Sequence, residues 1–486
     1  MTERLGGELL QSLRLAVGSH AVLDSPEELL AFEYDGYVSR ALPQAVVQPS
    51  TPGQAAASVA AALRSGVPVT ARGGGTGLSG GSIPEQGGLL VDLNQMHRIL
   101  EVDQDNRAAL VEPALLNLDL SNAVAQFGLF YAPDPSSQKA STIGGNIAEN
   151  AGGPHCLSRG TTTNHVLGLQ MVAQDGALMT LGGPAPDAPG YDLVGLAVGS
   201  EGMFGVVTRA WLRLLPSPVE TVTFLGLFDS VHAAGAAVSS IVAHGVVPSA
   251  LELIDAPSAR ALEQSFHAGY PDDIGAVLLI DCDGLPESVE AQAAVVRRLC
   301  EETPGNRGVR YAGTTAERDL LWKARKGALA AMARIAPNYY LCDGVVPRSR
   351  LADVLRRVYE VGDRERVIIA SVAHVGDGNL HPLVLYDARE PDVMERVHRA
   401  ADDIIRLCVE AGGTITGEHG VGIEKRDYMG WMFTEDDLER MRRVRRAFDP
   451  HELFNPGKVF PGVSAAAGAA RPHVRETAAI GPDAWI

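Results

Sequence analysis

Residues 71–81 read Ala71-Arg-Gly-Gly-Gly-Thr-Gly-Leu-Ser-Gly-Gly81, a glycine-rich run within a chain of 486 residues. Glycine has no Cβ, so such a run lets several backbone N–H groups converge on one anion. The part from Gly75 to Gly80 matches the pattern G-x-G-x-x-G. A Rossmann dinucleotide site, however, needs a strand before this pattern and a helix after it. The flanks of the run therefore decide the fold.

Both flanks of the glycine run are strand-like. Residues 67–70 and 89–93 are mostly aliphatic, and residues 82–88 between the run and the second flank contain one proline and two glycines. Proline and glycine at these positions argue against a helix after the run. A Walker A loop is also excluded, because no Gly-Lys-Ser/Thr follows. We expect a phosphate-binding loop between two strands, in a fold other than Rossmann.

Two further glycine-dense patches lie at residues 133–153 and 198–207. Each joins apolar, strand-like residues through small residues, which let backbone approach a ligand closely. An ordinary turn is the alternative for any one patch, because short motifs often match by chance. Three patches between residues 71 and 207 suit a large, phosphate-bearing cofactor better than a single phosphate.

Composition limits the class of protein. A net charge of −18 without a basic tract argues against a nucleic-acid partner, and 46% hydrophobic residues indicate large cores. From these patterns we expect no secretory signal, and no apolar run reaches the roughly 18 residues that a membrane span requires. We therefore expect any membrane contact to be peripheral, through a partner. Five scattered cysteines without C-x-x-C argue against disulfides, iron–sulfur clusters and structural zinc, and favour the cytoplasm.

The chain divides into four parts by pattern. Residues 1–218 contain the three glycine patches and a helix expected from Pro52 to Ser65, with Thr51 as its N-cap. Residues 219–410 contain helical patterns at 287–300, 315–332, 348–361 and 391–410 between short strands, typical of an α+β domain. Residues 411–462 are again rich in glycine loops, and residues 463–486 lack periodicity and are expected to be disordered.

A histidine pair marks the expected chemical site. Two apolar runs in residues 368–386 flank Asp377-Gly378, a strong hairpin signal. A turn centred there would put His374 directly opposite His381, with Cβ atoms about 4.5–5.5 Å apart. Such a pair suits a divalent metal, and Glu418 is the expected third ligand, which leaves positions open for substrate. Two histidines that only form hydrogen bonds in a strand pair are the alternative.

The three patches resemble the vanillyl-alcohol-oxidase-type flavoproteins, in the branch of the FAD-linked D-2-hydroxyacid dehydrogenases. The motifs of this resemblance are residues 72–81, 133–146 and 199–205, and the likeness extends from about residue 10 to residue 460. It implies an α+β protein with a two-part FAD-binding domain (1–218), an α+β cap domain for substrate (219–410) and a C-terminal segment that returns to the flavin (411–462).

The resemblance also implies the cofactor contacts, with the pyrophosphate of FAD on residues 73–77. The residues expected to bind FAD are Arg72, Gly73, Gly74, Gly75, Thr76, Gly77, Ser79, Pro133, Asp134, Ser137, Thr142, Gly144, Gly145, Asn146, Asn150, Gly199, Glu201, Gly202, Gly205, Val206 and Asn455. Many relatives attach the flavin to a histidine in the glycine loop. Because residues 71–81 contain no histidine, we expect non-covalent FAD.

In the same family, the positions of His374, His381 and Glu418 bind a metal, for which Zn, Mn or Fe would fit. The resemblance implies that His419 is the general base, that Arg325 binds the substrate carboxylate, and that Asn379 contacts substrate or flavin. Lys323 and Lys326 are expected on a solvated helix face. The reaction implied is removal of the hydroxyl proton of a 2-hydroxy acid and hydride transfer to flavin N5, with the metal lowering the hydroxyl pKa.

The substrate is expected to be short. In the hydroxyglutarate branch a lysine after the arginine helix binds the distal carboxylate, and residues 339–347 contain no lysine. The chain is most similar to the flavoprotein subunits of bacterial glycolate oxidases. That likeness implies a second FAD-binding subunit and an iron–sulfur subunit as partners, or quinone as acceptor. D-lactate and D-2-hydroxyglutarate dehydrogenases are the alternatives, together with a non-catalytic flavin-binding subunit and a metal hydrolase.

Overall fold

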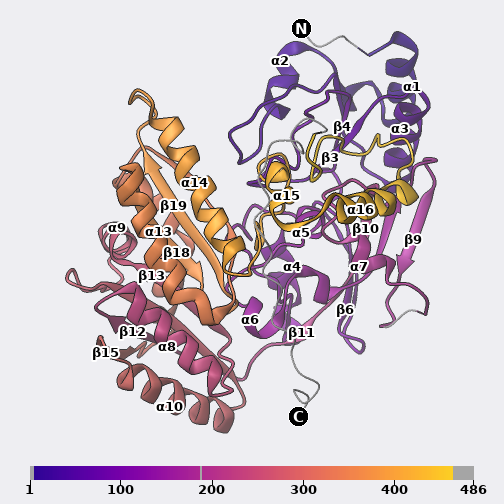
Figure 1. Ribbon diagram of the computed structural model, residues 1–486. Helices are drawn as coiled ribbons and strands as arrows, with labels where there is room; N and C mark the ends of the chain where they lie inside the picture. The colour runs from indigo at the N-terminus through magenta and orange to yellow at the C-terminus, as the bar shows by residue number, and fades with distance from the viewer. Residues whose placement is uncertain (1–4, 187–188, 463–486) are drawn as a thin grey trace.

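A four-stranded sheet carries the glycine run in the computed structural model, which describes residues 5–186 and 189–462 (Figure 1). Its order is β1-β2-β4-β3, with β1 Val22–Leu23, β2 Ala45–Val47, β4 Leu89–Asp92 and β3 Val69–Arg72. Strands β2 and β3 both pair in parallel with β4. No helix lies between β3 and β4, so the glycine run is a loop between two strands, as predicted, and not part of a Rossmann unit.

Helices α1 (Gly7–Val17) and α3 (Pro52–Arg64) pack on this sheet, and α2 (Pro26–Leu29) lies between them in the chain. Helix α3 confirms the predicted start: the Thr51 side chain accepts the N–H of Gln54, and Pro52 is the first helical residue. Ala55, Ala61 and Ala62 of α3 are buried in the core that also contains side chains of β3 and β4. The apolar side chains of these elements form one core.

A second, antiparallel sheet completes the N-terminal half of the molecule. Its order is β5 (Ile99–Asp103), β6 (Ala108–Val111), β10 (Val206–Arg213), β8 (Val166–Val172) and β9 (Leu178–Gly182). This half also contains α4 (Asn117–Val124), α5 (Ile143–Glu149), α6 (Cys156–Arg159), α7 (Leu193–Ala197) and the short pair β7 (Leu129–Phe130) and β11 (Leu215–Pro216).

The second glycine patch differs from its prediction. Residues 143–149 form helix α5 and are not strand-like, because Thr142 caps the helix by accepting the N–H of Gly145. The third patch likewise follows a helix, α7, and only its C-terminal end enters a strand, β10. Glycines and a threonine that indicate a strand turn also suit the first turn of a short helix, and local sequence does not distinguish the two.

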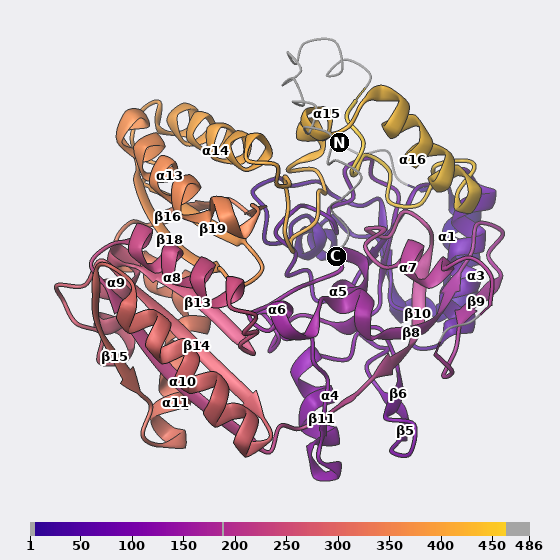
Figure 2. The same ribbon diagram turned by 60° about the horizontal axis from the view of Figure 1, so that its bottom comes forward.

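The second unit is a single antiparallel sheet of eight strands, which we call the cap sheet, between two layers of helices (Figures 1 and 2). Its order is β15 (Asn306–Tyr311), β12 (Glu220–Phe228), β14 (Ala276–Gly284), β13 (Ala250–Asp255), β18 (Ile368–His374), β19 (Asn379–Tyr386) and β16 (Asn338–Leu341), with β17 (Gly344–Val345) also on β19. One face packs against α8 (Val231–Ala243), α10 (Pro286–Glu302), α13 (Leu351–Glu365) and α14 (Val393–Glu410). The other face packs against α9 (Ala256–Phe266), α11 (Thr315–Lys326) and α12 (Ala328–Ala331).

Alternation along the cap strands determines which side chains face each helix layer. On β13, Leu251 and Leu253 belong to the core under α8 and α13, whereas Ile254 belongs to the core under α9 and α11. The predicted helices of this unit are confirmed, with one difference: the pattern at 315–332 divides into α11 and α12 at Gly327. Four of the five free cysteines (Cys282, Cys300, Cys342 and Cys408) lie in the core of this unit.

The C-terminal segment leaves the cap sheet and returns to the N-terminal half. Helix α15 (Met429–Met432) is followed by α16 (Glu435–Phe448), which lies beside the N-terminal half in both views. Phe448 stacks on Phe204 at a ring-centroid distance of 4.5 Å. Phe454 forms a parallel bridge with Val69 of β3 and is fully buried. The predicted disordered tail, residues 463–486, lies outside the described residues.

Among the helices of the described ranges, none combines the length and apolar content needed to cross a bilayer.

The burial of Phe454 predicts how firmly the C-terminal segment is attached. Phe454→Ala removes a ring with 0% exposure from the core under β3 and leaves a cavity, so we expect the free energy of unfolding to fall by about 3–5 kcal/mol. Denaturant unfolding followed by circular dichroism measures this. Phe127→Ala, at a ring that is 39% exposed, is the control and should change little. Equal effects of the two substitutions would contradict the packing role of Phe454.

Candidate active site

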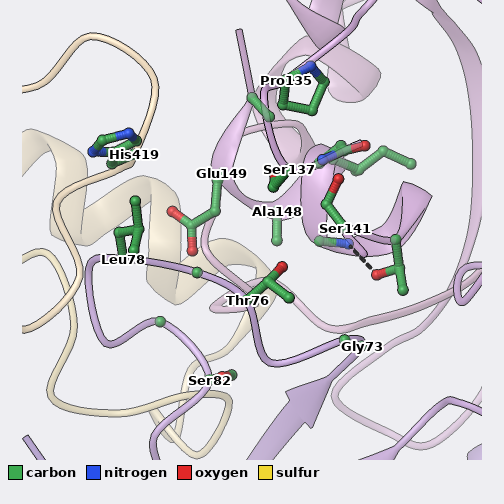
Figure 3. Close-up of a pocket in the computed structure, with 18 of the residues that line it drawn as sticks. Gly73, Thr76, Leu78, Ser82, Pro135, Ser137, Ser141, Ala148, Glu149 and His419 are labelled. Carbon is green, nitrogen blue, oxygen red and sulfur yellow. Dashed lines mark hydrogen bonds between the residues drawn. The ribbon is translucent and has the colours of Figure 1, made fainter. Parts of the chain in front are cut away.

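A cavity of about 240 Å³ is lined by both units of the molecule. The N-terminal half contributes the glycine loop after β3, helix α5 and residues 200–207, and the second unit contributes residues of α11, β18, β19 and the loop after α14. Figure 3 shows Thr76, Glu149 and His419 around the same space. The predicted cofactor residues that line the cavity are Arg72, Gly73, Gly74, Gly75, Thr76, Gly77, Ser137, Thr142, Gly144, Gly145, Asn146, Glu201, Gly202, Gly205 and Asn455.

Six predicted cofactor residues lie behind this lining: Ser79, Pro133, Asp134, Asn150, Gly199 and Val206. Ser79 and Pro133 connect neighbouring segments through their carbonyl groups. The carbonyl of Ser79 accepts the N–H groups of Ile423 and Glu424, which fixes the C-terminal loop to the glycine loop. The carbonyl of Pro133 accepts from the Asn117 amide, and that amide also donates to Asn146. These residues are therefore structural neighbours of the cavity and not part of its wall.

The glycine loop has the features of an anion cradle. Among the described residues, no protein acceptor pairs with the backbone N–H groups of residues 73–77, although these residues line the cavity. A Cβ on Gly74 would lie 2.6 Å from the carbonyl oxygen of Ala140, and Gly75 has a φ of +62°. Unpaired N–H groups on a loop that only glycine can form fit the phosphates of a dinucleotide.

Several lining residues were not predicted from the sequence, among them Leu78, Gly81, Ser82, Ser136, Ser141, Ile147, Ala148 and Glu149. Glu149 is the most distinctive. Burial raises the pKa of its carboxyl group well above the usual value, and the nearby carboxyl groups of Glu201 and Asp35 add to this rise. The signal that could have identified Glu149 is helical periodicity, because Gly145, a predicted cofactor residue that lines the cavity, lies four residues earlier on the same face of α5.

The histidine hairpin forms with a register different from the predicted one. His374 lies opposite Asn379, and His381 lies opposite Val372, so the prediction that the two histidines are directly opposite is wrong. The turn comprises residues 375–378, because the Asp377 side chain accepts the N–H of Asn379 and Gly378 adopts a φ of +88°. The shift amounts to two residues, which keeps both histidines on the same face of the sheet.

The predicted metal ligands are brought together at one end of the cavity. Oε1 of Glu418 lies 3.3 Å from Nε2 of His374 and 3.1 Å from Nε2 of His381. The two imidazole rings are nearly perpendicular, with centroids 5.0 Å apart. The ligand atoms of the three residues all lie within 4.8 Å of one another. Two hydrogen-bonded strands and a distant loop thus contribute one donor set.

Unsatisfied atoms in this cluster fit a metal ion. Nδ1 of His381 and Oε2 of Glu418 are buried without a hydrogen-bond partner, and Nε2 of His381 approaches Oε1 of Glu418 at 3.1 Å without the geometry of a hydrogen bond. Buried polar atoms without partners are rare and costly, and a cation bound by Nε2 of His381 and by Glu418 would satisfy the atoms of these two residues that face each other. Two imidazoles and a carboxylate are a donor set typical of Zn, Mn or Fe.

Asp343, His381 and His419 form a second cluster of potential ligands. Here the Lys425 ammonium group lies 3.0 Å from Asp343 and is 1% exposed. Because this ammonium already balances the Asp343 charge, the cluster suits a cation less well than the first one does. Asp343 and Lys425 were not predicted as site residues. An aspartate inside an otherwise apolar stretch, residues 339–346, was the available signal.

Asp343 positions the loop that carries Glu418 and His419. Its carboxylate accepts the N–H groups of Gly417 at 2.9 Å and His419 at 3.2 Å, and the Thr416 hydroxyl at 2.6 Å. Burial opposes ionisation of Asp343, but Lys425 and the two nearby imidazoles outweigh it and hold the pKa well below the usual value. An ionised carboxylate thus organises the residues between Thr416 and His419.

Electrostatics give the histidines different protonation tendencies. Burial lowers the pKa of His374, but the carboxylates of Glu252 and Glu418 outweigh it and raise this pKa to about 10. For His419 burial dominates over the attraction of Asp343, and the pKa is lowered to about 4. His419 is therefore neutral at pH 7.

Arg325 lines the same end of the cavity and is 3% exposed. Its Nη2 lies 2.6 Å from Oε2 of Glu252, a fully buried residue that sequence reasoning missed. Asn379 is 3% exposed and begins β19, but it does not line the cavity.

Lys326 differs from its prediction. Instead of lying on a solvated face, it lines the cavity and pairs with Asp134 of the N-terminal half at 3.2 Å, whereas Lys323 is exposed as expected. Spacing along a helix predicts which residues face the core of the helix's own domain. It does not predict whether a second domain covers the opposite face of that helix.

Comparison with known proteins supports these observations. Residues 43–182 match the family described as FAD binding domain, and residues 217–459 match FAD linked oxidases, C-terminal domain. Glycolate oxidase subunit GlcD of Escherichia coli (strain K12) is 43% identical over 97% of this chain and 96% of its own length. The subunit of that name from Bacillus subtilis is 40% identical over 90% and 93%. D-lactate dehydrogenase of Archaeoglobus fulgidus is 34% identical over 85% and 90%.

Solved structures share the fold at low identity. p-Cresol methylhydroxylase matches with a TM-score of 0.78 at 16% identity, covering 93% of this chain and 96% of that chain. 4-Ethylphenol oxidase from Gulosibacter chungangensis matches with a TM-score of 0.76 at 20% identity and the same coverage. Together these likenesses confirm the predicted vanillyl-alcohol-oxidase-type fold. The chain belongs to the FAD-linked oxidases, with an FAD-binding domain followed by the C-terminal domain of that family.

Proposed function

We propose that this protein oxidises a short 2-hydroxy acid, glycolate in particular, to the 2-oxo acid with FAD as the hydride acceptor. The observation that carries the proposal is a single cavity with an anion cradle at residues 73–77 and the cluster of His374, His381 and Glu418 elsewhere in its wall. Relatives named glycolate oxidase subunit and D-lactate dehydrogenase support the same class of reaction.

The N-terminal half holds the cofactor in this proposal. The free N–H groups of residues 73–77 bind the pyrophosphate, and Asn455 joins the C-terminal segment to the site by donating to the carbonyls of Gly81 and Glu201. Bound FAD supplies the hydride acceptor, its N5 atom. The loop offers no histidine for a covalent bond, so the flavin is held by non-covalent contacts alone.

The cluster of His374, His381 and Glu418 would hold a divalent metal, whose contribution is to lower the pKa of the substrate hydroxyl group. The protein's own residues perform the remaining steps. His419, neutral at pH 7, takes the hydroxyl proton at a ring nitrogen, and Asp343 lies 3.8 Å from its Nδ1 and stabilises the resulting charge. Arg325 binds the substrate carboxylate, because a guanidinium group suits two carboxylate oxygens at once.

The wall around Arg325 favours a short substrate. Leu329, Leu341 and Val372 line the cavity and offer only apolar contact. Lys326 also lines it, but Asp134 holds its ammonium group at 3.2 Å. Arg325 differs, because its Nε–H group is buried without a partner even though Nη2 pairs with Glu252. A second carboxylate would therefore lack a free cationic partner, which favours glycolate, keeps D-lactate as the alternative and disfavours D-2-hydroxyglutarate.

A non-catalytic flavin-binding subunit is the alternative of another class, and the assembled His374, His381, Glu418 and His419 argue against it. We propose that electrons pass to a second FAD-binding subunit and an iron–sulfur subunit, or to quinone, at the cytoplasmic side of the membrane. The E. coli relative, named as a subunit, supports a complex. In this proposal residues 1–218 bind FAD, residues 219–410 bind substrate and residues 411–462 complete the site.

Anaerobic reduction of the flavin tests the reaction. We expect glycolate to bleach the flavin absorbance of the isolated chain, D-lactate to do so less efficiently, and D-2-hydroxyglutarate least. Treatment with a chelator should slow bleaching strongly, since His374, His381 and Glu418 then lack their cation. Absence of bleaching with every 2-hydroxy acid would favour the non-catalytic subunit. Preference for the dicarboxylate would contradict the apolar wall.

Arg325→Ala tests the substrate contact. Loss of a charge-assisted contact to the carboxylate should raise KM for glycolate by about tenfold or more, with the FAD content unchanged. Lys323→Ala, an exposed position on the same helix, is the matched control and should leave KM unchanged. An unaltered KM in Arg325→Ala would remove Arg325 from the substrate site.

Gly74→Ala tests the anion cradle. The added Cβ would meet the Ala140 carbonyl at 2.6 Å and force the loop away from residues 140–142, so we expect loss of most bound FAD. The measure is flavin released into the supernatant by acid precipitation. Gly53→Ala, where the added Cβ meets no atom within 4 Å, is the control and should retain FAD. Flavin that stays with the precipitated wild-type chain would contradict non-covalent binding.

A further inference from the structure

Glu252 is a buried acidic side chain to which the proposed reaction assigns no step. It lies on β13, directly opposite His374 of β18, and its exposure is 0%. Strand alternation turns it away from Leu251 and Leu253 and toward the face that carries the histidines. A buried carboxylate needs compensating partners, because an unpaired charge is costly to remove from water.

The first partner of Glu252 is His374. Nδ1 of His374 lies 2.8 Å from Oε1 and 2.9 Å from Oε2 of Glu252, and Nε2 of the same ring faces Glu418. Histidines that bind a metal through one nitrogen commonly donate the other N–H to a carboxylate, which fixes the tautomer and the ring orientation. Glu252 thus directs Nε2 of His374 toward Glu418 and His381.

The second partner is Arg325, which reaches Glu252 from helix α11. Nη2 of Arg325 lies 2.6 Å from Oε2 of Glu252. Within residues 5–186 and 189–462, Glu252 is the one acidic side chain that forms an ion pair with Arg325. A long side chain loses rotamer freedom when it is held in one geometry, and this buried ion pair holds the guanidinium group before substrate arrives.

We propose that Glu252 is a positioning residue that orients the metal-binding His374 and the substrate-binding Arg325 together. This inference rests on the proposed function, which assigns those roles to His374 and Arg325. A 2-hydroxy acid carries its hydroxyl and carboxylate groups at a fixed separation. One carboxylate that touches both binding groups sets the distance between them, so Glu252 adapts the site to the 2-hydroxy acid framework.

A purely structural role predicts something different. If Glu252 only joined β13 to α11, its replacement would lower stability and leave the folded protein's affinity for metal and substrate unchanged. A positioning role changes both affinities. The two roles are therefore distinguished by binding measurements on folded protein and not by stability.

The test compares wild type with Glu252→Gln, which keeps the size of the side chain and removes its charge. The first readout is zinc affinity of the chelator-treated, FAD-loaded protein, titrated with zinc alone against a fluorescent chelator. We expect it to fall by about 10–100-fold. The second readout is KM for glycolate in anaerobic flavin reduction, which we expect to rise by about tenfold, since substrate must then order the guanidinium group.

A double variant separates the two contacts. In an Arg325→Ala background, Glu252→Gln should still weaken zinc binding, but its effect on KM should shrink to less than about twofold, because the partner that transmits it is absent. Asp255→Asn is the matched control. Asp255 lies on the same strand as Glu252 and is 1% exposed. Its carboxylate accepts hydrogen bonds from the backbone N–H groups of Ser258 and Ser371 and from the Tyr359 hydroxyl group. This variant should lower the unfolding temperature without changing either readout.

The outcomes keep the inference apart from the proposed function. If wild type binds zinc and is reduced by glycolate, but Glu252→Gln changes neither readout or only one, the shared positioning role is overturned and the proposed function stands. If wild type binds no zinc, the inference is overturned. If, in addition, no 2-hydroxy acid reduces the flavin of wild type, the proposed function also fails. If Glu252→Gln does not fold, Glu252→Asp replaces it in the test. This variant keeps the charge but withdraws the carboxylate from both partners, so we expect the same losses of zinc affinity and of substrate affinity. Unchanged values in Glu252→Asp would equally overturn the inference.

Discussion

The meeting of Glu418 with the histidines of the β18–β19 hairpin is the contact on which the rest of the site depends. Oε1 of Glu418 approaches His374 and His381 at 3.3 and 3.1 Å from a loop that follows α14. That loop keeps its position because Asp343 accepts its backbone N–H groups and is itself compensated by Lys425. Loss of either partner from a buried carboxylate–ammonium pair strongly destabilises the fold, because the other charge is left unpaired. The Asp343–Lys425 pair therefore favours a single conformation of this loop.

The two units of the chain are coupled at the same place. Asp134 of the N-terminal half pairs with Lys326, the neighbour of Arg325 on α11. His155 also pairs with Asp134 and stacks on Trp322 of the same helix, with ring centroids 5.6 Å apart. The lower pKa of the Asp134 carboxyl group follows from His155 and Lys326, which outweigh its burial. The helix that carries Arg325 is therefore held by contacts with a loop of the N-terminal half that flanks the cavity.

Local signals predicted much of the fold because they act over short distances. Thr51 and Pro52 specify the start of α3 through one hydrogen bond and one fixed φ angle, and the structure has that start. The glycine run could be assigned to a strand–loop–strand segment because proline and glycine exclude a helix after it. The second patch was misassigned, since small residues capped by a threonine suit a turn or the first turn of a helix equally well.

The sequence by itself determined the residue types that the proposed chemistry requires and their order along the chain: a glycine loop, two histidines on one face of a hairpin and a Glu-His pair beyond them. Side chains alternate along a strand with a period of two, so a register error of two residues left the prediction that His374 and His381 share one face correct. Only the tertiary structure decided that Glu252 links His374 with Arg325, that Asp343 holds the loop of Glu418, and that Lys326 contacts the N-terminal half. These contacts join residues between 73 and 192 positions apart in the chain, and no local preference encodes such a separation, because it follows from the packing of whole strands and helices.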